Sequence, residues 1–277
     1  MKSTLDAAVV ALLLGSLSVA WCAPAEWEAS VRKGCEALRA GRYGEARDLL
    51  TRAVKEGVRA GGDETRLAVA TRELAAAHLA LSNPDKAKGL LRQALPILER
   101  RTGPESAQVG ETLRVLGECL RQLERYDEAE RLLVQAHRIL ARARPSDHGL
   151  IAATLTSLGA LKVATGQFAK AEELLTKARR LQEAKSGDPG GLSDVLDELG
   201  LLFLVMQRSR EAQKTLESAL TLRKKVYGES HLKVADTLNR LGALHYSLQQ
   251  PVEDCAYHLA ALTIREQTLP PDHPDVG

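Results

Sequence analysis

Apolar and polar residues alternate along residues 110–136 with the period of an α-helix, interrupted once. In the first half, Leu113, Leu116 and Leu120 recur every three or four residues, which places them on one helix face. The second half restarts the same spacing after a polar turn at residues 124–125. The pattern predicts two amphipathic helices that pack against each other through their apolar faces.

The same pattern recurs along most of the chain at intervals of 41 or 42 residues. Positions 8 and 20 of each unit are glycine or alanine in every case except Asp254, as expected where two helix backbones approach closely. The period indicates a repeat protein in which each unit is one pair of helices. The six units begin, as position 1, near Trp27, Ala68, Gly110, Ala152, Ser193 and Ala235.

The small residues at positions 8 and 20, such as Gly117 and Ala129, together with Tyr126 at the turn, resemble the tetratricopeptide repeat (TPR). That family's usual unit has roughly 34 residues, whereas units of this greater length resemble the kinesin light chain type. The resemblance implies an all-α fold, a right-handed α-solenoid of stacked antiparallel helix pairs. It also implies a concave groove, lined by the first helix of each pair, that holds a peptide or a partner protein.

The composition fits a repeat protein better than a compact domain with a single core. The chain is 44% hydrophobic and 27% charged, but only 3% aromatic. A single core of this size normally contains more bulky side chains, whereas a solenoid buries small residues between neighbouring units. The net charge is +2, and no run of Lys and Arg mixed with aromatic residues is present, which argues against nucleic acid as a partner.

Residues 1–23 are typical of a targeting segment and not of the repeat pattern. An apolar run from Ala7 to Ala20 follows Lys2, and residues 18–20 offer the small residues of a cleavage site. The run is shorter than the roughly 20 residues of a transmembrane helix. We expect a signal peptide and an exported protein, either periplasmic or secreted. The alternative is an uncleaved N-terminal anchor, which would then be the only contact with a membrane.

The repeat array is expected over residues 24–277, and residues 273–277 match the opening of a seventh unit. Repeat arrays usually end in a polar capping unit, which this sequence does not show. We therefore expect the seventh unit to be truncated. This leaves an alternative function open, in which the array is the N-terminal docking or sensing segment of a longer enzyme or effector.

The sixth unit departs from the pattern of the others. Asp254 falls where a small residue packs, and His258 falls at the position of Leu133 in the third unit. Because burying a carboxylate is costly, we expect the helix to shift by one residue, so that Cys255 and Leu259 take these two places.

One cluster in the sixth unit offers ligands for a metal. His245 and His258, with Cys255 and Asp254 nearby, would suit zinc, but their spacing matches no compact zinc motif. We expect no bound metal and no cofactor. The cysteines beyond the leader, Cys35, Cys119 and Cys255, lie in units too far apart for a disulfide and are predicted to be free thiols.

The resemblance assigns the groove to unit positions 2, 5, 9, 12 and 13, which form a basic middle and an acidic far end. Because arginine pairs with carboxylates in bidentate geometry, we expect a partner with acidic residues. Alternating charge is equally typical of a solvated solenoid surface that binds nothing. The predicted partner-binding residues are Arg72, Arg114, Glu118, Arg121, Asp194, Asp197 and Asn239, and other groove positions hold Gln122, Thr156, Asp236 and Tyr246.

Motifs of enzyme chemistry are missing from the sequence. It contains no glycine-rich phosphate loop, no nucleophile elbow and no paired histidine ligand motif. The sequence therefore predicts a non-catalytic scaffold that binds a protein or peptide in the groove of a superhelix.

Overall fold

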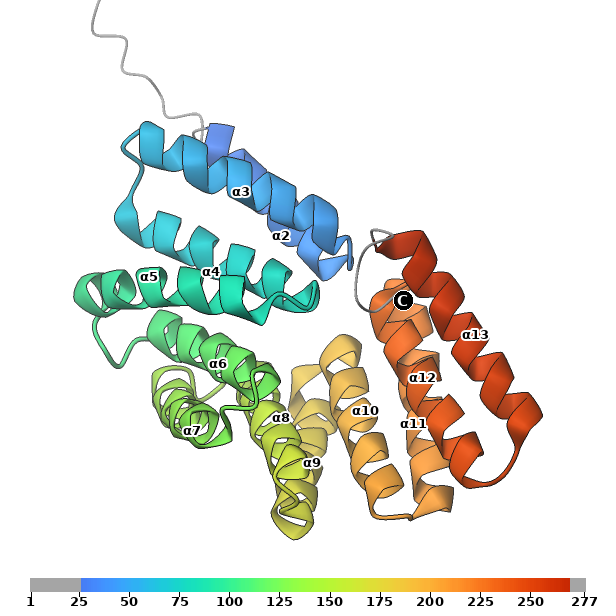
Figure 1. Ribbon diagram of the computed structural model, residues 1–277. Helices are drawn as coiled ribbons and strands as arrows, with labels where there is room; N and C mark the ends of the chain where they lie inside the picture. The colour runs from blue at the N-terminus through green and yellow to red at the C-terminus, as the bar shows by residue number, and fades with distance from the viewer. Residues whose placement is uncertain (1–25, 270–277) are drawn as a thin grey trace, which may run out of the picture.

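Figure 1 shows the computed structural model, which describes residues 26–269 apart from the side chains of residues 185 and 186. Within this range the chain forms twelve α-helices and one short π-helical turn, with no strand, so the expectation of an all-α fold is confirmed. The elements are α2 (Glu26–Arg39), α3 (Tyr43–Arg59), α4 (Glu64–Ala80), α5 (Pro84–Thr102), α6 (Ala107–Gln122), α7 (Tyr126–Ala143), α8 (His148–Ala164), α9 (Phe168–Leu181), η1 (Gln182–Ser186), α10 (Pro189–Val205), α11 (Ser209–Tyr227), α12 (Leu232–Ser247) and α13 (Pro251–Thr268).

Consecutive helices form six antiparallel pairs that stack along an arc (Figure 1). Each expected unit start lies inside the first helix of a pair, for example Gly110 in α6 and Ser193 in α10. Each pair also packs on the next one along the chain. The chain is therefore a repeat solenoid, in which every unit buries its apolar faces against its neighbours.

A glycine in the first helix of most pairs faces a leucine in the second. A Cβ atom on Gly117 would lie 2.6 Å from Cγ of Leu133, and one on Gly159 would lie 2.6 Å from Cγ of Leu175. Both leucines are completely buried. A larger side chain has no room at these glycines, since protein interiors are close-packed. This contact explains why position 8 of the repeat is small.

Helix starts and turns follow signals that are present in the sequence. Asp63 precedes α4, and its carboxylate accepts a hydrogen bond from the backbone N–H of Arg66 at 2.9 Å. Pro84 is the first residue of α5, where the N–H that proline lacks is not needed. The turn between α6 and α7 passes through Glu124, whose φ is 58°. Such short turns keep the two helices of a pair antiparallel.

The sixth unit keeps the register of the others, so the expected one-residue shift of its second helix is wrong. A Cβ atom on Gly242 would lie 2.7 Å from Nε2 of His258, which takes the place of the leucine in other units. Leu259 is 63% exposed, and Cys255 is exposed as well. The carboxylate of Asp254 lies 3.0 Å from His258 Nε2. The side chain of Asp254 keeps 17% of its exposure, which lowers the cost that the shift was expected to avoid.

The two ends of the arc meet where the turn between α2 and α3 reaches the start of α12 (Figure 1). The ring of Tyr43 packs edge-on against His231, with 5.9 Å between the ring centroids. Leu81, Leu232 and Leu269 form a small buried cluster beside Tyr43. We call these residues the closing contact. Through them the first two units touch the sixth.

The predicted targeting segment, residues 1–23, and the predicted opening of a seventh unit, residues 273–277, lie outside the described residues. Among the described helices, none is both long and apolar enough to cross a lipid bilayer.

Candidate functional site

The stacked helices surround a cavity of about 540 Å³ at the centre of the arc. Its wall comes mainly from α4, α6, α8, α10 and α12, the first helices of units two to six. The second helices contribute little, because they pack on the outside of this inner layer. The lining residues are Tyr43, Ala76, Leu79, Ala80, Ser82, Arg114, Val115, Glu118, Arg121, Gln122, Thr156, Ser157, Ala160, Asp194, Glu198, Arg223, Leu232, Lys233, Asp236 and Arg265.

The cavity contains four of the seven residues that the sequence analysis assigned to partner binding. Arg114, Glu118 and Arg121 come from α6, where their spacing of four and three residues puts them on one helix face. Asp194 comes from α10. Three other groove positions, Gln122, Thr156 and Asp236, also line the cavity, whereas Arg72, Asp197, Asn239 and Tyr246 do not.

Arg72 lies behind the cavity wall in α4 and is only 8% exposed. Its guanidinium pairs with Glu73 at 2.7 Å and with Glu111 of α6 at 2.9 Å. Arg72 therefore joins units two and three. The prediction from the repeat position, which placed Arg72 on the groove surface, is wrong for this residue.

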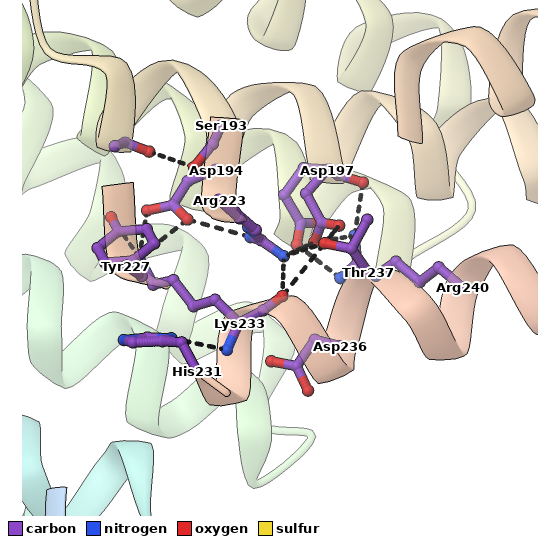
Figure 2. A network of polar contacts seen from close by, with 12 residues as sticks. Ser193, Asp194, Asp197, Arg223, Tyr227, His231, Lys233, Asp236, Thr237 and Arg240 are labelled. Atoms are coloured by element: carbon purple, nitrogen blue, oxygen red, sulfur yellow. Dashed lines mark hydrogen bonds and ion pairs between the residues drawn. The ribbon is translucent and has the colours of Figure 1, made fainter. Parts of the chain in front are cut away.

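Asp197 is not on the groove surface either, because a network of ion pairs buries it between α10, α11 and α12 (Figure 2). Its carboxylate lies 3.0 Å from Arg223 and 2.9 Å from Arg240, and it accepts a hydrogen bond from Thr237 at 2.9 Å. Burial raises the pKa of this carboxyl above its ordinary value, although both arginines act to lower it. The physical reason for the different location is Arg223, which reaches inward from the second helix of unit five.

Asp194 lines the cavity but is already paired (Figure 2). Lys233 lies 2.6 Å from its carboxylate, and Arg223 lies 3.1 Å from it. Burial raises the pKa of Asp194, but Lys233 and Arg223 outweigh that effect, so the pKa lies below its ordinary value. The acidic end of the groove that the sequence predicts is therefore neutralised within the fold.

Asn239 points from α12 toward α13 and not into the cavity. Its Oδ1 lies 2.6 Å from Nδ1 of His258. The amide helps to accommodate the histidine that replaces a leucine in this unit, which explains why Asn239 lies away from the cavity wall.

The acidic side chains of the cavity wall are all held in ion pairs. Glu118 pairs with Arg121 one turn further along α6. Glu198 lies 2.9 Å from Arg240, and Asp236 lies 3.1 Å from Arg265. With Asp194 paired as well, no acidic side chain among the lining residues is left without a cation.

Arg114 is different from the other cations of the wall. Its guanidinium makes no ion pair with any residue in the described range, and its Nε is buried without a hydrogen-bond acceptor. Burial lowers the pKa of Arg114 below its ordinary value, and Glu118 and Glu111 offset only part of this effect. The cavity wall thus carries one half-buried cation that forms no ion pair among the described residues.

The histidines considered as zinc ligands have other partners. His245 Nδ1 lies 2.7 Å from the side-chain oxygen of Gln250, and His258 contacts Asn239 and Asp254. The described residues contain no group of three or more His, Cys, Asp or Glu side chains that could hold a metal ion. Cys35, Cys119 and Cys255 are free thiols, as predicted.

Several cavity residues lie outside the groove positions of the repeat. Arg223 and Arg265 extend from the second helices α11 and α13, and Tyr43 belongs to the closing contact. Both arginines occupy the same position of their units, 31. A search for long cationic side chains at that position could have found them. The location of Tyr43 beside the cavity, in contrast, follows from the curvature of the whole stack, which no single repeat position shows.

The tetratricopeptide repeat family model matches residues 35–100, 108–184 and 192–253, and a second model of the same description matches residues 234–275. No curated protein sequence matches the chain.

Three solved structures share the fold at low sequence identity. The Rap protein complexed with Competence and Sporulation Factor is 12% identical, with a TM-score of 0.70 over 94% of this chain and 80% of that one. NprR in complex with its cognate peptide NprX is 10% identical, with a TM-score of 0.70 over 94% and 73% of the two chains. A kinesin light chain with TPR-like repeats from Podosopora anserina is 22% identical, with a TM-score of 0.52 over 74% and 97%.

Proposed function

Because the chain belongs to the tetratricopeptide repeat family, with repeats of the kinesin light chain type, we propose that it is a non-catalytic scaffold that binds a peptide in its central cavity. The observation that carries the proposal is the cavity wall, to which the first helices of five successive units contribute. Its volume of about 540 Å³ lies within the range of ligand pockets. A short peptide, or one segment of a partner protein, fits this space.

Two of the similar structures support a peptide ligand. Rap was solved with Competence and Sporulation Factor, and NprR was solved with its cognate peptide. Both share the arrangement of helices over most of this chain, although not its sequence. The fold is therefore one that holds peptides in other proteins, and the binding itself is our proposal for this one.

The non-catalytic role rests on the state of the charged groups. The acidic side chains among the lining residues, Glu118, Asp194, Glu198 and Asp236, each form an ion pair. For Asp194 and Glu198 the cationic partners outweigh burial and hold the pKa below its ordinary value, and a carboxylate of this kind is a poor general base. The wall is suited to holding a ligand and not to moving its protons.

We also propose that the ligand is acidic and that the protein is exported. The charged lining residues carry one more positive than negative charge. The export proposal rests on the apolar run of residues 7–20. A ligand would then reach the cavity outside the cytoplasm.

A binding assay with a cavity-filling variant tests the proposal. The full chain is mixed with random-sequence pentapeptides that have free termini, and the peptides retained after ultrafiltration are identified by mass spectrometry. Ala80, an exposed residue at the end of α4 that lines the cavity, is changed to tryptophan. The matched control is Ala169→Trp, on the exposed side of α9.

We expect the native chain and Ala169→Trp to retain the same peptides, and Ala80→Trp to retain few or none. Equal retention by Ala80→Trp would place binding outside the cavity. If the native chain retains no peptide, the proposal of a peptide scaffold is wrong.

A further inference from the structure

The outward side of α13 carries apolar residues where the other outer helices carry charge. Positions 18, 22, 25 and 29 of each unit lie in the second helix and are exposed, apart from the half-buried Gly44 and Thr176. In units one to five at least two of these four residues are charged, whereas in unit six none is. In chain order the six sets are Gly44, Asp48, Thr51 and Lys55; Asp85, Gly89, Arg92 and Pro96; Asp127, Arg131, Val134 and Arg138; Ala169, Glu173, Thr176 and Arg180; Arg210, Lys214, Glu217 and Thr221; and Val252, Ala256, Leu259 and Thr263.

The exposure of this side does not follow from the place of α13 at the end of the arc (Figure 1). Val134 holds position 25 in unit three, which has a neighbouring unit on each side, and it is still 53% exposed. Leu259 holds the same position in unit six and is 63% exposed, and Val252 is 77% exposed. Stacking of units therefore leaves these positions in solvent. We call Val252, Ala256, Leu259 and Thr263 the outer seam.

The outer seam makes α13 apolar on two opposite sides. Its inner side packs on α12 through the buried Ala261 and Ile264 and the partly buried Tyr257. An ordinary surface helix has one apolar stripe, and a helix that is apolar on all sides is usually buried on all sides. A second apolar stripe without charge marks a surface where another molecule packs.

The spacing of the outer seam fits a second copy of the same helix. Steps of four, three and four residues are those of the positions that face a partner helix in a coiled coil. These steps read the same in both directions, so an antiparallel copy brings the two seams into register. Leu259 then packs over Ala256 of the partner subunit, and Val252 packs against Thr263 of the partner subunit. A large side chain opposite a small one fills the space between the helices.

A parallel copy of α13 fits less well. It would place the two copies of Ala256 opposite each other and leave a gap between them. It would also bring the two copies of the exposed Glu253 side by side, and such a pair of like charges is unfavourable. In the antiparallel register Glu253 lies opposite Leu262 of the partner subunit, which carries no charge.

We propose that the protein forms a two-fold symmetric dimer through the outer seam, with α13 of one protomer antiparallel to α13 of its partner. The inference does not depend on peptide binding, because Arg265 is the only residue of α13 among those that line the cavity. The two protomers use the same surface, as in most homodimers. One helix pair is smaller than a standard interface of roughly 1,600 Å², so the dimer is weak and forms at micromolar concentration.

Sedimentation of the full chain over the micromolar range of concentrations measures the dimer. A reducing agent is present, so that the exposed thiol of Cys255 cannot link two chains. The variants are Leu259→Glu and Ala256→Trp in the outer seam. Val134→Glu is the matched control, because it introduces the same charge at the same position of unit three. All three positions are exposed, so circular dichroism should show the same helicity in every variant.

We expect the native chain and Val134→Glu to dimerise equally. Leu259→Glu should raise the dissociation constant of the dimer about tenfold or more, because the dimer would bury two carboxylates without partners. Ala256→Trp should weaken the dimer too, since the indole occupies the space that Leu259 of the partner subunit fills. A native chain that stays monomeric, or a dimer that Leu259→Glu leaves intact, would overturn the proposal. A dimer strengthened by Ala256→Trp would show non-specific apolar association and would also overturn it.

Disulfide formation tests the orientation of the two helices. Val252→Cys and Thr263→Cys are made in separate chains, each combined with Cys255→Ser. The antiparallel register predicts that oxidation links the two variants when they are mixed, and that neither variant forms many covalent dimers alone, because the α-carbons must lie within about 7 Å. Covalent dimers of each variant alone would indicate a parallel pair and would contradict the proposal.

Discussion

The ring of His231, at the start of α12, packs against Tyr43, at the start of α3, and so joins the last described unit to the first. Their centroids lie 5.9 Å apart, and the two rings are nearly perpendicular. His231 also stacks on Tyr227 at 4.5 Å, which holds the imidazole in place. This closing contact converts an arc of stacked helix pairs into a structure whose two ends support each other.

Gly41→Ala tests the closing contact. Gly41 has φ of 72°, and a Cβ atom there would lie 1.9 Å from Nε2 of His231. We expect the substitution to separate the two ends and to increase the radius of gyration in small-angle X-ray scattering. The loss of stability should exceed about 1 to 2 kcal/mol, which is the cost of left-handed backbone strain alone. Gly61→Ala is the control, because φ there is 66° but nothing lies within 4 Å. Similar effects of both substitutions would contradict the account.

The closing contact should also make stability depend on pH. Burial, together with the charges of Lys233 and Arg223, lowers the pKa of His231 to about 4, although Asp194 acts to raise it. In the unfolded chain the pKa of histidine is about 6.5. Between about pH 4 and pH 6.5, His231 therefore binds a proton in the unfolded chain but not in the folded one. The contribution of His231 is therefore complete above pH 6.5 and is lost toward pH 4, by about 1.4 kcal/mol per pH unit.

Urea unfolding at pH 7.5 and pH 5 measures this dependence. Nδ1 of His231 accepts a hydrogen bond from the backbone N–H of Lys233 at the start of α12, and asparagine can replace it there. Burial also lowers the pKa of His78 and His137, so only the difference between the native chain and His231→Asn reports on His231. We expect the variant to lose less stability on acidification. Equal losses would show that His231 does not titrate as described.

Asp197→Ala should be one of the most destabilising substitutions in the second half of the chain. Asp197 is 2% exposed and compensates the buried Arg223 and the partly buried Arg240. Removing this carboxylate should lower the free energy of unfolding by about 3 kcal/mol. This is the lower end of the range for breaking a buried ion pair, because both arginines keep a second acidic partner. Asp236→Ala, which removes an exposed pair with Arg265, should cost less than about 1 kcal/mol. Equal losses of stability in chemical denaturation would argue against a structural role of the network.

The repeat architecture could be predicted from the sequence because its physical cause is local. Gly117 and Leu133 meet in the same way as Gly159 and Leu175, and this contact recurs with the period of the sequence. Even in the sixth unit, where His258 replaces the leucine, the register is kept. The expected shift overestimated the cost of Asp254, because its side chain keeps 17% of its exposure instead of being fully buried.

The roles of individual groove residues could not be predicted in the same way. The repeat position assigned Arg72 and Asp197 to the groove, but each is withdrawn from the cavity by a side chain of a neighbouring helix. Whether a charged residue is paired depends on which long side chain reaches it across a unit boundary. Tyr43 meets His231 only because the curvature of the whole stack brings the two ends together. Of these contacts, only that of Arg223 has a signal in the period of the sequence, because Arg265 occupies the same unit position.

The sixth unit can be restored to the pattern of the others. The double substitution His258→Leu with Asp254→Ala places a leucine against Gly242 and removes the carboxylate that would lose its partner. We expect a gain of up to about 1 kcal/mol, because the histidine is partly exposed and its pair with Asp254 contributes little. Asp254→Ala alone should be close to neutral. A lower unfolding temperature for the double variant would show that the contact of His258 with Asn239 matters more than the apolar contact.

The most direct test of the central claim is to locate a bound peptide by photo-crosslinking. A peptide retained by the full chain is made with a photoreactive residue at each position in turn, and the crosslinked protein residues are identified by mass spectrometry. The account predicts crosslinks to the cavity side of α4, α6, α8, α10 and α12, with competition by unlabelled peptide. Crosslinks confined to the outer helices α5, α7 and α9 would contradict it.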